Sequence, residues 1–248
     1  MRTSYTFDTA GYRHLLEDFL KAGYQAGAID GLPEQDGILY LRHDVDFSPE
    51  AAMEMAKVET EVGVFAHYYF ITTSPFYNLF DPAVRNCLKS IVEGGHKIGL
   101  HCDAAANGGL DLISQLRHEK ATLESASGTA CESFSYHRPP KDVLASEDAV
   151  DGMTSCYGES WFKGIKYCSD STGAWRFGLP TDTNEFASKK SIQLLTHPIW
   201  WYLDTLESPE KRLQKFYETR CNQVLESIDM NSTVKVSGNA PNKGADRE

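Results

Sequence analysis

Asp44 and Asp46 stand at the end of segment 38–46, which begins as an apolar run. On an extended backbone, side chains two positions apart point to the same face, so the two carboxylates share a face while His43 points to the other. Carboxylates on one face repel each other unless a cation, a proton or an arginine lies between them. This pair is therefore predicted to do chemistry rather than to serve the fold alone.

Further groups of the catalytic kind follow later apolar segments, at the ends of predicted strands. They are His101, Asp103, His137, Arg138, Asp170 and His197. In a βα barrel all these strand ends share one rim, which suits a divalent metal with nitrogen and oxygen ligands and a free position for water. Such a metal acidifies water and polarises a carbonyl, while a carboxylate takes a proton and a histidine protonates the leaving group. The spacing predicts a metal-assisted hydrolase of an amide or an ester.

The elements that must position these groups alternate between strand and helix. The patterns predict strands near 38–46, 66–71, 97–101, 132–136, 165–169 and 192–196, and helices near 9–23, 48–63, 81–94, 110–125 and 209–228. Three βα alternations in a row indicate parallel strands with crossover helices. Six or seven such units in 248 residues favour a barrel or a distorted barrel over an open sheet, although periodicity alone leaves closure open.

One large domain suits a chain of this length. We expect residues 1–37 to form an N-terminal helix and a link packed on the barrel, and residues 38–230 to form the barrel itself. Residues 231–248 are rich in Asn, Gly, Lys and Pro and are expected to be a disordered tail.

Composition narrows the classes of partner and location. A net charge of −11 with no concentrated basic face argues against nucleic acid and against a polybasic membrane contact. The N-terminus lacks the apolar region of a secretory signal, and no apolar run approaches the ~20 residues that span a bilayer. We therefore expect a soluble, cytoplasmic protein without membrane insertion.

The polar blocks occur in an order that resembles the polysaccharide deacetylases, carbohydrate esterases that remove N-acetyl groups from sugars. The blocks are residues 42–46, 95–103, 137–140, 169–171 with 175–176, and 195–198. Segments 76–78 and 196–201 look like those of the intracellular branch associated with lipopolysaccharide O-antigen synthesis. The resemblance implies a single-domain distorted (β/α)7-type barrel and a divalent metal, most often zinc.

The resemblance also implies roles in proton transfer. Asp44 matches the family's general base and His197 its general acid. Arg138 matches the arginine that orients the base, and Asp170 the acid that partners the catalytic groups.

The metal positions match only in part. Asp46 matches the metal-binding aspartate and His101 the first metal-binding histidine, but the family's second histidine position holds Ala105. Either another residue supplies the third ligand or the metal is weak or absent. The candidates are His137 and Asp103, ranked equal, and then His43, which faces away from Asp46 on a regular strand.

The implied activity is that of a carbohydrate N-deacetylase, a hydrolase of linear amides. Its partner would be an acetamido sugar, sugar nucleotide or oligosaccharide in surface-polysaccharide biosynthesis. Trp175 and Trp200 are candidate substrate-binding platforms, because sugar rings stack on aromatic faces. The alternatives are a carbohydrate-binding relative that lacks the full metal triad, a hydrolase of another small amide or cyclic imide, and a scaffold partner in a glycan-assembly complex.

Overall fold

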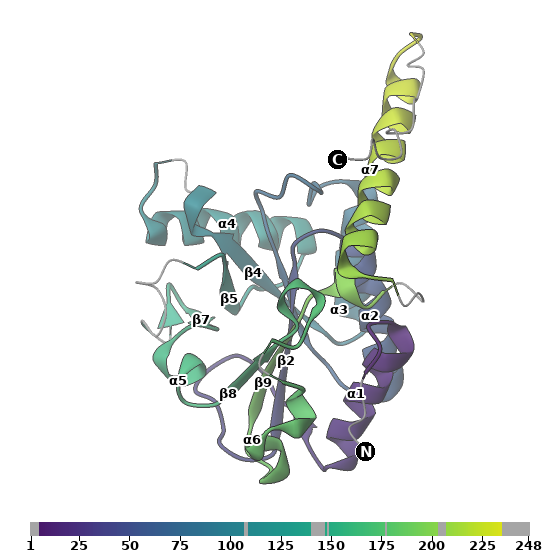
Figure 1. Ribbon diagram of the computed structural model, residues 1–248. Helices are drawn as coiled ribbons and strands as arrows, with labels where there is room; N and C mark the ends of the chain where they lie inside the picture. Colours follow the sequence, from purple (N-terminus) through teal and green to yellow (C-terminus); the bar gives the residue numbers. More distant parts are fainter. Residues whose placement is uncertain are drawn as a thin grey trace, which may run out of the picture. The chain divides into compact units, whose positions relative to one another are not determined.

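The computed structural model describes residues 5–106, 109–139, 147, 149–176, 178–202 and 207–234. The chain divides into two compact units, Met1–Thr205 and Leu206–Glu248. The first is an α/β body built on one mostly parallel sheet (Figure 1), and the second contains the helix α7 (Pro209–Asn231). The predicted disordered tail lies outside the described residues from residue 235 onward. The boundaries 1–37 and 38–230 stay predictions.

The sheet follows the strand order β6-β7-β5-β4-β3-β2-β9-β8, and the short β1 also pairs with β2. Every pairing is parallel except that of β6 with β7. The strands are β1 (Gln25–Ala26), β2 (Ile38–Val45), β3 (His67–Phe70), β4 (Lys97–Asp103), β5 (Ser133–His137), β6 (Ala149–Val150), β7 (Met153–Ser155), β8 (Lys166–Ser169) and β9 (Ile192–Thr196).

The sheet is curled, because side chains of strands that are not neighbours meet on its inner side. The hydroxyls of Tyr69 on β3 and Ser133 on β5 lie 2.9 Å apart, although β4 separates their strands. Ser135 on β5 likewise reaches Asp44 on β2 at 3.3 Å. The predicted α/β fold of the distorted-barrel type is confirmed, in the form of a half-barrel.

Helices cross over between the parallel strands, and α1, α2 and α3 lie side by side (Figure 1). The helices of this unit are α1 (Thr9–Lys21), α2 (Pro49–Val62), α3 (Pro82–Glu93), α4 (Leu112–Ser127), α5 (Glu159–Phe162) and α6 (Asn184–Ala187). Helix α2 begins as its sequence predicts, since the Ser48 hydroxyl accepts the Ala51 N–H and Pro49 occupies the first turn. It ends at Gly63, which adopts φ 85°.

Strand β2 lies in the middle of the sheet and is buried along almost its whole length. Its alternation places Arg42 and Asp44 on the inner side of the curl. His43 points to the opposite side, where α1 and α2 cover the sheet. Strand β2 therefore contributes polar side chains to both faces of the sheet: Arg42 and Asp44 on the inner face, and His43 on the opposite face.

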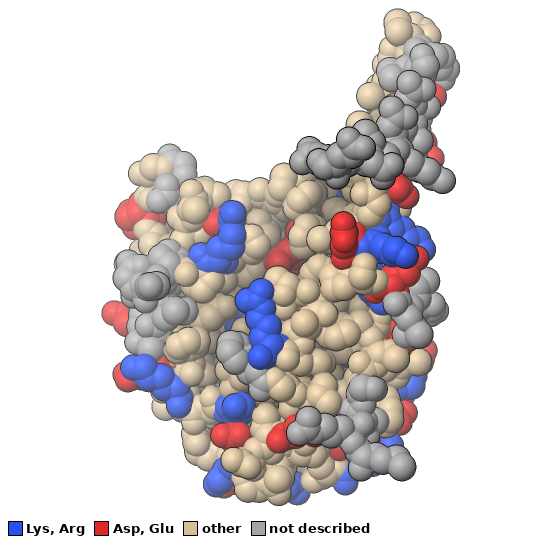
Figure 2. Space-filling model, in the orientation of Figure 1, with Lys and Arg blue, Asp and Glu red and all other residues tan. Residues whose placement is uncertain are grey.

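The surface of the described residues is of mixed charge. On the face drawn in Figure 2, Lys and Arg side chains are interspersed with Asp and Glu. Among the helices in the described ranges, none combines the length and the apolar character that crossing a membrane requires.

Candidate metal centre and active site

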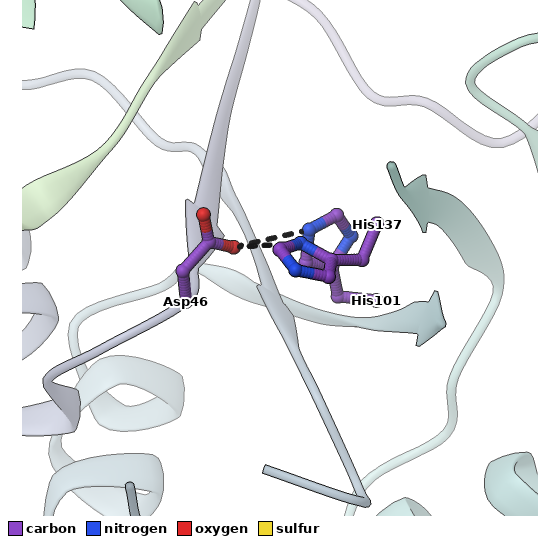
Figure 3. Close-up of side chains that lie close together, drawn as sticks. All are labelled: Asp46, His101 and His137. Atoms are coloured by element: carbon purple, nitrogen blue, oxygen red, sulfur yellow. Dashed lines mark ion pairs between the residues drawn. The ribbon is translucent and has the colours of Figure 1, made fainter. Parts of the chain in front are cut away.

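Three side chains that could hold a metal ion meet at the carboxyl ends of the inner strands. Asp46 directly follows β2, His101 lies on β4 and His137 ends β5. His101 Nε2 lies 3.2 Å and His137 Nδ1 lies 3.5 Å from the same oxygen, Oδ1 of Asp46. Figure 3 shows the two imidazole rings facing that oxygen. We call these three residues the open cluster.

The donor set of the open cluster fits a divalent cation. Oδ1 of Asp46 is buried and has no hydrogen-bond partner within the described part of the chain. A cation bound tetrahedrally about 2.1 Å from each ligand atom separates those atoms by about 3.4 Å, which matches both distances to Oδ1. One carboxylate and two imidazoles are ligands typical of zinc.

The charges of the open cluster favour an ionised carboxylate. Burial alone would raise the pKa of Asp46, but the rings of His101 and His137 more than offset this and hold it well below its usual range. In turn, the adjacent Asp46 carboxylate raises the pKa of His137. An oxygen that faces two imidazole nitrogens needs either a proton on a ring or a cation between them.

Asp44 lies beside the open cluster and is almost fully buried. Arg42 Nη2 donates to both of its oxygens, at 2.9 and 3.2 Å, and the Ser135 hydroxyl donates to Oδ1 at 3.3 Å. Burial alone would raise the pKa of Asp44. The Arg42 guanidinium and His101 more than offset this, so the pKa lies below its usual value. Asp44 is thus an ionised carboxylate in a fixed orientation, 3.7 Å from His101 Nε2.

Arg42 is the arginine that contacts Asp44, whereas Arg138 was the one expected there. The Arg138 side chain is 69% exposed and forms an ion pair with Asp103. Its φ of 50° turns the chain at the end of β5. Arg42 was missed, although the signal was present: residues two apart on a strand share a face, and Arg42 precedes Asp44 by two.

The three candidates for the third ligand are placed differently. His137 joins Asp46 and His101 in the open cluster. Asp103 pairs with Arg138 through Oδ2 and accepts the backbone N–H of Ala105 through Oδ1. His43 lies on the far face of β2.

His197 and Asp170 stand together at the ends of β9 and β8. Oδ1 of Asp170 lies 2.6 Å from His197 Nδ1, and Oδ2 accepts the indole N–H of Trp201 at 2.6 Å. His197 Nε2 is directed toward the open cluster, 3.9 Å from Asp46 Oδ2. Burial disfavours the charged imidazole, but Asp170 more than offsets it and raises the pKa of His197 to about 9.

The tryptophans expected to bind substrate are largely enclosed. Trp200 is buried, and Trp175 is half-buried with its ring 6.0 Å from that of Trp201. Both indole N–H groups are buried and have no partner within the described ranges. Trp201, which the sequence predicts only as a core residue, is buried and donates its indole N–H to Asp170.

No protein-family model and no curated protein matches this sequence. Solved structures do show some likeness. A family 4 acetyl xylan esterase from Clostridium thermocellum, in complex with a cobalt ion, is 14% identical over 77% of this chain and 90% of its own, with a TM-score of 0.38. The peptidoglycan deacetylase PdaC from Bacillus subtilis is 11% identical over 81% and 99%, with a TM-score of 0.42.

A CE4 family pseudoenzyme from Bacillus anthracis is 15% identical over 73% of this chain and 60% of its own, with a TM-score of 0.36. At such identities and TM-scores, neither an activity nor a lack of one follows for this chain.

Proposed function

We propose that this chain is a metal-dependent carbohydrate N-deacetylase of the polysaccharide deacetylase type. Its substrate would be an acetamido sugar, sugar nucleotide or oligosaccharide used in surface-polysaccharide (O-antigen) biosynthesis. The observation that carries the proposal is the open cluster, with the ionised Asp44 on one side and the Asp170-bound His197 on the other. The order of the sequence blocks supplies the carbohydrate part of the proposal.

Asp46, His101 and His137 would hold the metal, and zinc suits this set of ligands best. When bound, such an ion polarises the acetamide carbonyl and acidifies a water molecule. His137 would take the place of the second histidine that the resemblance expects at Ala105.

Asp44 would act as the general base and accept a proton from the attacking water. Its ion pair with Arg42 keeps the carboxylate charged. The pair also limits the rotation of the carboxylate, because Arg42 Nη2 donates to both Oδ1 and Oδ2. Removal of a positioned base typically lowers a rate by about 10²–10⁴-fold.

His197 would act as the general acid and protonate the departing amine through Nε2. Asp170 holds the opposite nitrogen, Nδ1, so the ring presents Nε2 to the open cluster. The raised pKa of His197 keeps a proton available on this ring at neutral pH.

The test is acetate release by purified protein that has been stripped with a chelator and reloaded with zinc, cobalt or manganese. Acetamido-sugar nucleotides and N-acetylated oligosaccharides are the substrates to offer. We expect metal-dependent release that falls about 10²-fold or more in Asp44→Asn. Asp36→Asn, which replaces a carboxylate that is 69% exposed and forms an ion pair with Lys190 outside the site, is the matched control. No release with any metal, together with no effect of Asp44→Asn, would overturn the proposal.

Ala105 supports a second candidate, a carbohydrate-binding relative that holds no metal. That protein would bind oligosaccharide equally well with and without zinc and release no acetate. Turnover of cyclic imides with none of sugars would instead favour a hydrolase of small amides.

A further inference from the structure

The Ser135 hydroxyl lies between the open cluster and Asp44. Its Oγ is 2.7 Å from His101 Nδ1 and 3.3 Å from Asp44 Oδ1. All three side chains are buried, with exposed fractions of 0%, 2% and 3% for Ser135, His101 and Asp44. Water is therefore largely excluded from these contacts.

Two features of the sheet bring the hydroxyl to this place. Ser135 is the parallel partner of His101 in the pairing of β4 with β5, so the two side chains are neighbours. The contact with Asp44 on β2 crosses the inner side of the half-barrel, past β4 and β3. Ser135 thus contacts both His101, a member of the open cluster, and Asp44, the carboxylate beside it.

The direction of the two hydrogen bonds follows from counting protons. The Ser135 hydroxyl donates its single proton to Asp44 Oδ1, which also accepts from Arg42 Nη2. The Ser135 oxygen must then accept from His101, which requires a proton on Nδ1. That arrangement leaves a lone pair on His101 Nε2, the nitrogen that faces Asp46 in the open cluster.

We propose that Ser135 is a positioning residue that holds His101 with its proton on Nδ1 and connects this ring to Asp44. The inference rests on the proposed function in one respect, namely that His101 Nε2 is a metal ligand. Residues that hold the far nitrogen of a ligating histidine typically change metal affinity about 10–100-fold when they are removed.

Ser133→Ala is a matched control for Ser135→Ala. Ser133 is also buried, lies on β5 two residues away and therefore points to the same side, but its hydroxyl bonds to Tyr69. Both variants remove one buried hydroxyl from one strand. Only the variant at position 135 removes the contact with His101.

The first readout is the protonation pattern of His101 in metal-free protein, from imidazole ¹⁵N shifts at alkaline pH. We expect the Nδ1–H form in the natural protein and in Ser133→Ala, and loss of that preference in Ser135→Ala. The Nε2–H form in the natural protein would overturn the proposal. This measurement remains decisive even when a variant fails to fold.

The second readout is zinc affinity, measured by competition with a chelating dye. We expect about 10–100-fold weaker binding by Ser135→Ala than by Ser133→Ala. Equal affinities in the two variants would contradict a positioning role. Failure of the natural protein to bind zinc, cobalt or manganese would overturn the proposed function, while the ¹⁵N readout still decides the role of Ser135.

Discussion

Two carboxylate–imidazole clusters lie on opposite faces of β2, and they differ in how fully their polar atoms are paired. We call Glu59 on α2, His43 on β2 and the groups bonded to them the closed cluster. Glu59 accepts hydrogen bonds from Tyr12 and Tyr68 and lies 2.6 Å from His43 Nε2. The other nitrogen of His43 lies 2.6 Å from the Thr196 hydroxyl. Glu59, His43 and Thr196 are completely buried.

The open cluster, in contrast, has a buried acceptor without a hydrogen-bond partner, Oδ1 of Asp46. It is also reachable, since the side chains of Asp46 and His137 are 16% and 23% exposed. Buried polar groups in native proteins are normally paired, so an unpaired one calls for an explanation. We infer that similar residue types support the fold where all their polar atoms are paired, and are available to bind a cation where one partner has to come from solution.

The largest expected effect is a loss of folding stability when the closed cluster is disrupted. Glu59→Ala leaves His43 buried without its carboxylate and should lower the free energy of unfolding by about 3–5 kcal/mol. Urea denaturation followed by circular dichroism measures this. Glu17→Ala, on the exposed side of α1, is the control and should change the value by less than about 0.5 kcal/mol. A loss of that small size in Glu59→Ala would mean that the closed cluster does not support the fold.

Zinc should stabilise the protein only through the open cluster. At a free zinc concentration of 100 times the dissociation constant, the expected gain is about 2.7 kcal/mol. Glu59→Gln should show the same gain on a less stable background, whereas His137→Ala should show none at that concentration. Thermal unfolding with and without zinc gives the comparison, and an equal gain in His137→Ala would remove this residue from the metal site.

Acid should weaken the closed cluster. Burial raises the pKa of Glu59, but His43 more than offsets it, so the folded pKa lies below the unfolded value. The contribution of Glu59 to stability is therefore present above about pH 4.3 and is lost as pH falls toward the folded pKa. Metal-free Glu59→Gln should show a stability–pH slope that is smaller by up to about 1.4 kcal/mol per pH unit in this range. Parallel slopes would contradict an ionised Glu59.

The smallest expected effect concerns the edge of the open cluster. Arg138→Ala breaks an ion pair with Asp103 in which the Arg138 side chain is 69% and the Asp103 side chain 11% exposed, and it should cost about 1 kcal/mol. Because Arg42 is the guanidinium on Asp44, acetate release should keep its pH profile in this variant. A shifted acidic limb would instead support the orienting role that the resemblance implies for Arg138.

The parts of the site that could be predicted from sequence are those that follow from strand ends. Asp46 and His101 each end an apolar segment, and parallel strands bring such ends to one edge. The choice of His137 over Asp103 could not be predicted, because it depends on tertiary contacts: Asp103 pairs with Arg138, whereas His137 faces Asp46.

Contacts between residues far apart in the chain could not be predicted from the sequence either. The bond between Ser135 and Asp44 depends on how strongly the sheet curls, and no local pattern encodes that curvature. The pairing of Glu59 with His43 depends on how α2 packs on β2. Alternation placed His43 on the far face but did not name its partner.

The zinc content of the purified protein, after dialysis against a limiting zinc buffer, tests whether the open cluster is a metal centre. We expect stoichiometric zinc in the natural protein and in His118→Ala, which removes an exposed histidine on α4. Asp46→Ala and His137→Ala should retain little or no zinc. Zinc-free natural protein, or full zinc retention in both site variants, would contradict the assignment of the open cluster as a metal centre.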